Sequence, residues 1–202
     1  MLIGVGLGPG DPKLLTLKAV EILKNSAKVY VPGRLAKELV APYAEAELLK
    51  FPMTRDSEVL NTLWKENADR LVEESKKGDV AFGLIGDPNF FSTFSHLKRV
   101  MRQFYPDVEF ATVPGISSIT SFAARTDVAV ETSFEVSDGS EIGHKVHLKA
   151  RHPKKILEKM EAEGYKDFIF AERLFSEKEV IIKEKDKIPE EGNYFSIIYA
   201  KK

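Results

Sequence analysis

Short apolar segments alternate with amphipathic helical segments along the first two thirds of this chain. The apolar segments have the length and composition of buried strands, and they cover residues 2–5, 27–31, 79–85 and 108–113. Segments with hydrophobic residues at helical spacing separate or follow them, at residues 12–25, 35–40, 57–77, 94–104 and 116–125. Strands that alternate with helices favour a mostly parallel sheet with helices on both of its faces.

The pattern changes from about residue 131 onward. Short strand candidates predominate there, at residues 146–149, 167–171, 179–182 and 194–199. One clear helix is predicted for residues 153–163, ended by Gly164. We therefore expect a two-lobed α/β protein. Its N-terminal lobe, residues 1–130, carries the parallel sheet, and a smaller mixed α+β lobe, residues 131–202, carries a more antiparallel one.

Three loops that contain glycine follow predicted strands of the N-terminal lobe. Their sequences are GLGPGD at 6–11, GDPNFF at 86–91 and PGISS at 114–118. The carboxyl ends of parallel strands meet at one edge of a sheet, and ligands of such sheets bind at that edge. The sequence therefore predicts a ligand site formed by the three loops together.

The first loop places Gly4, Gly6, Gly8 and Gly10 close together, so the backbone itself is needed there. The spacing differs from the dinucleotide fingerprint G-x-G-x-x-G, and the chain has no G-x-x-x-x-G-K-[ST] phosphate loop. Asp11, expected to cap the following helix, would repel a pyrophosphate at the helix N-terminus. A neutral or cationic ligand and a tight turn without a ligand both remain open.

Composition limits the other classes of function. The 202 residues are 43% hydrophobic, which supports one large domain or two small ones. The net charge of −1 argues against a nucleic-acid or membrane-surface partner bound through bulk charge. The chain has no cysteine, no signal-peptide pattern and no long apolar run, so we expect a cytoplasmic protein without disulfides.

Three motifs in order resemble those of the tetrapyrrole (uroporphyrin-III C-type) methylase family. The first is VGLGPGD at 5–11 with LLTLKA at 14–19, the second GDP at 86–88 with FST at 91–93, and the third VPGISS at 113–118. FPMTRD at 51–56 and YFS at 194–196 are most similar to the precorrin-2 C-20-methyltransferase branch. That branch methylates precorrin-2, or its cobalt-bearing counterpart cobalt-factor II, on the way to cobalamin.

The resemblance implies S-adenosylmethionine as the methyl donor, bound between two α/β lobes of a homodimer and released as S-adenosylhomocysteine. Carried over position by position, donor contacts fall on Pro9, Ile85, Gly86, Asp87, Phe90, Ser117 and Ser118, with Leu148 from the second lobe. From the residues alone, Asp87 has the alternative role of capping its own loop. The two serines have the alternative role of capping the next helix.

A tetrapyrrole substrate carries several carboxylates, so we expect arginine or lysine in its cleft. Arg34 and Lys37, in predicted loops after the early strands, and Arg55 in FPMTRD are the candidates. The aromatic pair Phe90 and Phe91 either flanks a ligand or packs under the next helix. The expected reaction is direct displacement, which needs no covalent catalyst, and the sequence identifies no general base.

His144, His147 and His152 are close in sequence, but the first two would point to opposite faces of a strand. We therefore expect no metal held by the protein, and any cobalt would arrive within the substrate. Two alternatives to the C-20 reaction stay open. One is another enzyme of the family, such as a different-carbon precorrin methylase or a diphthine synthase, and the other is a non-catalytic S-adenosylmethionine-binding module.

Overall fold

The computed structural model describes residues 1–51 and 57–202, with the side chains of 57–61 excepted. The chain divides into two compact units, Met1–Phe134 and Glu135–Lys202, hereafter unit 1 and unit 2. Each unit has its own sheet and its own hydrophobic core. Each is therefore described by itself.

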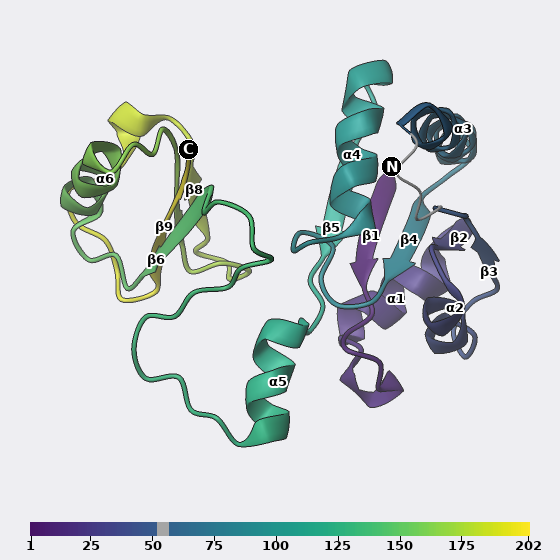
Figure 1. Ribbon diagram of the computed structural model, residues 1–202, viewed down its shortest axis with the longest axis horizontal. Coiled ribbons are helices and arrows are strands. Elements are labelled where there is room, and N and C mark those ends of the chain that lie inside the picture. The colour runs from purple at the N-terminus through teal and green to yellow at the C-terminus, as the bar shows by residue number, and fades with distance from the viewer. Residues whose placement is uncertain (52–56) are drawn as a thin grey trace. The chain divides into compact units, whose positions relative to one another are not determined.

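A parallel five-stranded sheet forms the centre of the described part of unit 1 (Figure 1). Its strands are β1 (Leu2–Gly6), β2 (Lys28–Val31), β3 (Ala46–Leu48), β4 (Val80–Leu84) and β5 (Phe110–Val113). The strand order is β3-β2-β4-β1-β5, and every neighbouring pair is parallel. The predicted parallel sheet is confirmed. The short edge strand β3 was not predicted, because three residues are too few to show a strand periodicity.

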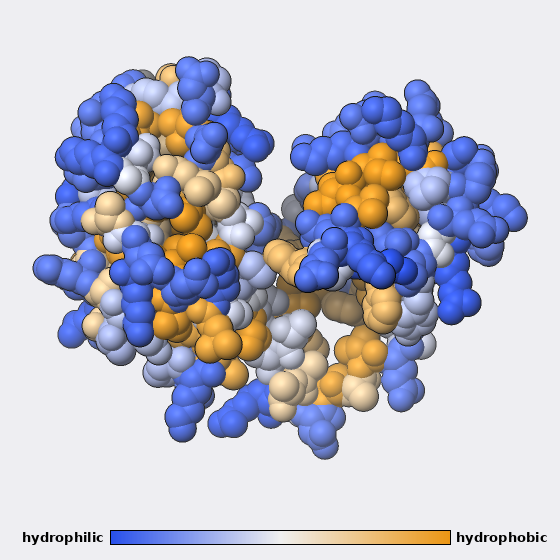
Figure 2. Space-filling model, turned by 180° about the vertical axis from the view of Figure 1, so that it is seen from behind, coloured by the Kyte–Doolittle hydropathy of each residue, from blue (hydrophilic) through white to orange (hydrophobic). Residues whose placement is uncertain are grey.

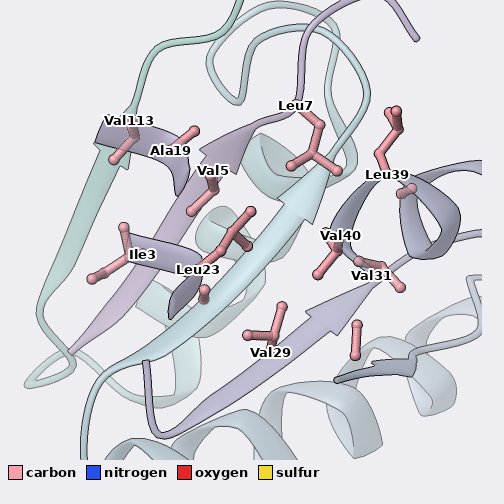
Figure 3. Close-up of a cluster of buried hydrophobic side chains, with 13 residues drawn as sticks. Ile3, Val5, Leu7, Ala19, Leu23, Val29, Val31, Leu39, Val40 and Val113 are labelled. Carbon is pink, nitrogen blue, oxygen red and sulfur yellow. The ribbon is translucent and has the colours of Figure 1, made fainter. Parts of the chain in front are cut away.

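Helices cover both faces of this sheet, as predicted. They are α1 (Leu17–Asn25) and α2 (Arg34–Val40) on one face and α3 (Ser57–Ser75) and α4 (Thr93–Phe104) on the other, whereas α5 (Ser118–Thr126) follows β5 and buries none of its residues. Ile3 and Val5 of β1 join the core formed with α1 and α2, where their side chains lie beside Leu23 (Figure 3). Leu2 joins the core formed with α3 and α4, on the opposite face. A side chain at Gly4 would collide with the ring of Phe94, so α4 lies close against β1.

The predicted start of the first helix was wrong. Asp11 and Pro12 begin only a single 3-10 turn (Pro12–Leu14), in which Asp11 Oδ1 accepts a hydrogen bond of 2.8 Å from Lys13 N. The α-helix begins at Leu17, because Thr16 Oγ1 accepts from Ala19 N at 3.1 Å and so caps it. Phe104, the last residue of the apolar stripe predicted for 94–104, is 47% exposed because it is the last residue of α4.

An antiparallel sheet of order β6-β9-β7-β8 forms unit 2. Its strands are β6 (His144–Leu148), β7 (Asp167–Glu172), β8 (Val180–Ile182) and β9 (Ser196–Lys201), and its helices are α6 (Pro153–Ala162) and the 3-10 turn Lys185–Lys187. Leu157 and Met160 of α6 are buried against Phe168 and Ile198 of the sheet. The mixed α+β character predicted for this part of the chain is confirmed. In the described residues, no helix has the length and hydropathy of a membrane span.

Candidate functional site

The three predicted loops follow adjacent strands of the unit 1 sheet. Strands β4, β1 and β5 lie side by side and parallel, so GDPNFF, GLGPGD and PGISS leave the same edge. Leu7 N donates to Leu84 O and Gly86 N donates to Gly8 O, both at 2.8 Å. The first and second loops therefore stay hydrogen-bonded to each other beyond the sheet, where Gly8 and Gly86 form an isolated antiparallel bridge.

Main-chain atoms pack directly on main-chain atoms where the loops meet. A Cβ on Gly6 would lie 2.5 Å from Gly115 N and 2.7 Å from Gly86 O. A Cβ on Gly115 would also come within 3.0 Å of Gly6 and Gly86, closer than real Cβ atoms approach. These glycines are required because three backbones share a space too small for any side chain.

Gly86 differs from its two neighbours in this cluster, because nothing lies within 4 Å of its missing Cβ. Its φ of +78° is also one that favours glycine. Apolar side chains of the same segment are exposed: Ile85 is 38% exposed, Phe90 56% and Phe91 68%. The aromatic pair therefore does not pack under α4. The loop offers a ligand an accessible backbone between exposed apolar groups.

Asp87 is buried and acts as a tie between loops. Its Oδ1 accepts a hydrogen bond from Asn89 N at 2.8 Å, and its Oδ2 accepts from Gly115 N at 3.1 Å. The alternative of a loop-capping aspartate is confirmed for the side chain. The carboxylates of Asp11 and Asp87 thus both accept hydrogen bonds from backbone N–H groups.

Ser117 and Ser118 begin α5, but the predicted capping role is wrong for both. Ser117 occupies the N-cap position and makes no side-chain capping bond. Neither hydroxyl has a hydrogen-bond partner among the residues that the structure describes. Two hydroxyl groups next to the glycine cluster are thus available for hydrogen bonds to a ligand.

The remaining sequence candidates of unit 1 are not among the residues that make the contacts between loops described above. Pro9 is half-buried in the first loop. Arg34 and Lys37 lie on helix α2 and not in loops, since α2 begins directly after Gly33. The Arg34 side chain is 92% exposed, and its Nε lies 3.3 Å from Glu38 Oε1. Arg55 lies outside the described residues.

Leu148, the candidate from unit 2, is the last residue of β6 and is 62% exposed. It lines a pocket of about 590 Å³ that belongs wholly to unit 2. The other lining residues are Lys149, Arg173, Leu174, Ser176, Tyr194, Phe195, Ser196 and Ile197. Leu148 therefore lies in a hollow of its own unit.

A larger hollow of about 800 Å³ in unit 1 lies at the opposite edge of the sheet, beside Met1 and Glu109. These residues precede β1 and β5, whereas ligands of parallel sheets bind beyond the carboxyl ends. Tyr105 donates a hydrogen bond to Asp69 in this hollow, which lowers the pKa of that carboxyl. This pair links α3 to the end of α4, so we assign the hollow a structural role.

The histidines form no metal centre in the described part of the chain, where no group of three or more His, Cys, Asp or Glu could hold an ion. His144 Nδ1 instead lies 2.7 Å from Tyr199 Oη across the β6–β9 pair. Burial lowers the pKa of His96, and the nearby Arg99 lowers it further. His96 packs against Trp64, away from the loop cluster, and its ring has a structural role.

Two features of the site were missed in the sequence. The contact of Gly6 with Gly115 joins residues more than 100 positions apart, and no local pattern signals it. Lys149 and Arg173 of the unit 2 pocket both have positive φ, which lysine and arginine rarely adopt and which composition does not reveal. In the sequence, this pocket was indicated only by Tyr194 and Phe195, which belong to the family-like segment YFS at 194–196.

Comparison with known proteins gives consistent matches. The family model described as Tetrapyrrole (Corrin/Porphyrin) Methylases matches residues 1–190. A Methanocaldococcus jannaschii protein named "Probable cobalt-precorrin-2 C(20)-methyltransferase" is 40% identical over 134 residues, covering 62% of this chain and 56% of the relative. A uroporphyrinogen-III C-methyltransferase of Methanobacterium ivanovii is 34% identical over 149 residues, covering 68% and 60%.

The chain thus spans a little over half the length of the curated relatives it matches. Among solved structures, the precorrin-6Y methylase of Archaeoglobus fulgidus is 26% identical, with a TM-score of 0.51 over 100% of this chain and 97% of that one. The match to the family model covers most of the chain and includes all three loops. The chain therefore belongs to the tetrapyrrole methylase family, whose members use S-adenosylmethionine as the methyl donor.

Proposed function

We propose that this chain is an S-adenosylmethionine-dependent C-methyltransferase that acts on a tetrapyrrole in cobalamin biosynthesis. The substrate is precorrin-2 or cobalt-factor II, and the methyl group is added at C-20. The relative from Methanocaldococcus jannaschii, with a name that specifies cobalt-precorrin-2 and C-20, supports this choice of substrate. FPMTRD at 51–56 and YFS at 194–196 support the same branch of the family.

The observation that carries the proposal is the convergence of three loops around Gly86. The open space at Gly86 lets a ligand approach the backbone closely, and Ser117 and Ser118 offer hydroxyl groups without partners in the described chain. Exposed Ile85 and Phe90 provide apolar contact area for an adenosine or a methionine side chain. These residues fit S-adenosylmethionine better than a phosphate ligand, because no lysine or arginine lies in the three loops.

The proposed residues bind and orient; none of them acts as a covalent catalyst. The bound donor supplies a methyl group activated by its sulfonium, and a meso carbon of the tetrapyrrole is the nucleophile. Pro9, Gly86 and the backbone of Asp87 would hold the donor, while Leu148 of unit 2 would contact its adenosine. Holding two reactants in line and away from water is worth about 7–11 kcal/mol of a reaction barrier. We propose that orientation and exclusion of water supply most of the rate enhancement, because the methyl donor and the nucleophilic carbon are both already activated.

Other members of the family remain alternatives for the reaction. The relative from Methanobacterium ivanovii has the name of a uroporphyrinogen-III enzyme, and the similar structure from Archaeoglobus fulgidus that of a precorrin-6Y enzyme. A diphthine synthase would use the same loop motifs on a protein substrate. A non-catalytic donor-binding module would retain the loop cluster without turnover.

Two measurements test the proposal. Calorimetry with S-adenosylhomocysteine should give a saturable heat, and its absence would reject both the enzyme and the binding module. Incubation with S-adenosylmethionine and precorrin-2, or with cobalt-factor II, should raise the product mass by one methyl group. Parallel incubations with uroporphyrinogen III separate the branches, and donor binding without any methylated product would identify a binding module.

We also propose that the protein works as a cytoplasmic homodimer. Helix α5 buries none of its residues within the chain, and Phe122 on this helix is 49% exposed. A second copy covering α5 would remove this apolar surface from water. Analytical ultracentrifugation should give twice the mass of the 22.7 kDa chain. Phe122→Ser should shift the protein toward the monomer, and an unchanged sedimentation coefficient would contradict the role of α5.

A further inference from the structure

The pocket of unit 2 lies where two parallel strands end and a third begins. Strand β9 lies between β6 and β7 in the sheet, and Leu148 pairs with Ile197 while Glu172 pairs with Ser196. Lys149 directly follows β6 and Arg173 directly follows β7. The two basic residues therefore flank the first residues of β9 from both sides.

The lining of the pocket combines apolar surface with positive charge. Leu148, Leu174, Tyr194 and Phe195 are all more than 40% exposed there, although such side chains are ordinarily buried. Apolar residues reach the surface of each unit in patches bordered by hydrophilic ones (Figure 2). Two of the nine lining residues are basic and none is acidic. The pocket therefore suits a flat apolar ligand with negative charge.

Among the described residues, neither cation of the pocket has a close carboxylate partner. Lys149 Nζ lies 5.3 Å from the centroid of the Tyr194 ring, and Arg151 stacks on the same ring at 5.7 Å. Lys149 has no carboxylate partner among the described residues. Arg173 Nε is 3.9 Å from Glu172 Oε1, the outer limit of an ion pair, so its guanidinium remains available to another anion.

The backbone at this pocket is held in an unfavourable conformation. Lys149 has a φ of +56°, Arg173 of +51° and Phe175, beside the pocket, of +63°. The described residues contain only two other non-glycine residues with positive φ, Phe91 and Asp127. Side chains in this region cost about 1–2 kcal/mol each, and such conformations concentrate at ligand sites.

We propose that Lys149 and Arg173 bind carboxylates of the tetrapyrrole substrate, with the macrocycle lying on the apolar side chains between them. This inference rests on the proposed function and assigns substrate recognition to unit 2. The donor carries a single carboxylate together with a positive ammonium and a positive sulfonium, so two cations would suit it less well than they suit a polycarboxylate.

Fluorescence titration with uroporphyrin, a stable planar octacarboxylate, tests the proposal on the full chain. Lys149→Gln and Arg173→Gln should each weaken uroporphyrin binding by at least about tenfold, as expected for a lost charge-assisted hydrogen bond. The difference in uroporphyrin affinity between the parent protein and each variant should shrink as the salt concentration rises, because salt screens the charge interaction in the parent protein. Lys149→Arg should retain the affinity. Lys155→Gln, which removes an exposed charge from α6, is the matched control and should also retain it.

Titration with S-adenosylhomocysteine on the same variants separates this proposal from the proposed function. Unchanged S-adenosylhomocysteine affinity with weakened uroporphyrin affinity supports the carboxylate subsite. A loss of S-adenosylhomocysteine affinity in Lys149→Gln would assign the cations to the donor and overturn the inference, as would unchanged uroporphyrin binding in both variants. If the parent protein binds uroporphyrin but no S-adenosylhomocysteine, the proposed function fails, and the subsite is still decided by the uroporphyrin result.

Discussion

The candidate ligand surfaces of the two units differ in the kind of atoms that form them. In unit 1 the surface is made of main chain, and its glycines leave no room for side chains at Gly6 and Gly115. In unit 2 the surface is made of side chains, with Lys149 and Arg173 beside exposed leucine and aromatic groups. A main-chain surface recognises shape and tolerates little substitution, whereas side chains can change without disturbing the fold. We therefore expect substitutions in unit 1 to affect folding and the donor, and those in unit 2 to affect the substrate.

The largest expected effect is that of Gly115→Ala. Its Cβ would collide with backbone atoms of Gly6 and Gly86, which cannot move independently of strands β1 and β4. We expect a loss of about 3 kcal/mol in the free energy of unfolding. Urea unfolding followed by the fluorescence of Trp64, which lies half-buried in unit 1, measures it.

Gly33→Ala is the control for this variant, because Gly33 has extended backbone and open space around its missing Cβ. It should cost less than about 1 kcal/mol, as substitutions at an N-cap glycine do. Equal costs for the two variants would mean that the contact of the three loops is looser than described.

The next effect in size is that of Gly86→Val on donor binding. The new side chain would fill the open position, and we expect S-adenosylhomocysteine affinity to fall at least about 100-fold in calorimetry. The positive φ of Gly86 adds a strain of about 1–2 kcal/mol. Gly139→Val carries a comparable strain, at a φ of +91° in an exposed turn, and should leave affinity unchanged. A similar loss in both variants would show that strain alone explains the effect.

Sequence patterns predicted the sheet, the helices and the three loops because each rests on local periodicity or on adjacent residues. The carboxyl ends of parallel strands lie at one edge of a sheet, so the meeting of the three loops was predictable too, whereas the strand order β3-β2-β4-β1-β5 was not predicted. The hydrogen bonds of individual side chains were not predictable. Whether Asp87 capped its loop or faced a ligand depended on the position of Gly115 N, 28 residues away. Whether Ser117 capped α5 depended on a side-chain rotation that the residue type does not determine.

A smaller effect is expected for substitution of Glu172, the last residue of β7, which binds Ser196 of the unit 2 pocket. Its Oε2 accepts hydrogen bonds from Asn193 N and Ser196 Oγ, both at 2.7 Å, and these hold its pKa below the ordinary value of 4.5. The stabilisation is therefore complete above pH 4.5 and is lost as the pH falls through the lowered pKa. Glu172→Ala should cost about 1–3 kcal/mol at pH 7, and this difference from the parent should shrink below pH 4.5.

Hydrogen exchange of the β7 and β9 amides, measured against pH, follows unit 2 alone. Glu161→Ala is the control, because Glu161 pairs with Lys185 at an exposed position and should cost less than about 1 kcal/mol. A difference between parent and Glu172→Ala that is independent of pH would show that packing, and not the carboxylate, supports the turn at Asn193.

The smallest effect distinguishes most sharply between folding and binding within unit 1. Ser117 and Thr16 both occupy N-cap positions, but only the Thr16 side chain makes the capping hydrogen bond. Thr16→Ala should therefore cost about 1 kcal/mol of unfolding free energy, and Ser117→Ala less than about 0.5 kcal/mol. For S-adenosylhomocysteine the order reverses, because Ser117→Ala removes a ligand hydrogen bond and should weaken binding about fivefold. If Ser117→Ala binds as tightly as the parent, the hydroxyl has no part in the donor site, and main-chain groups alone form that surface.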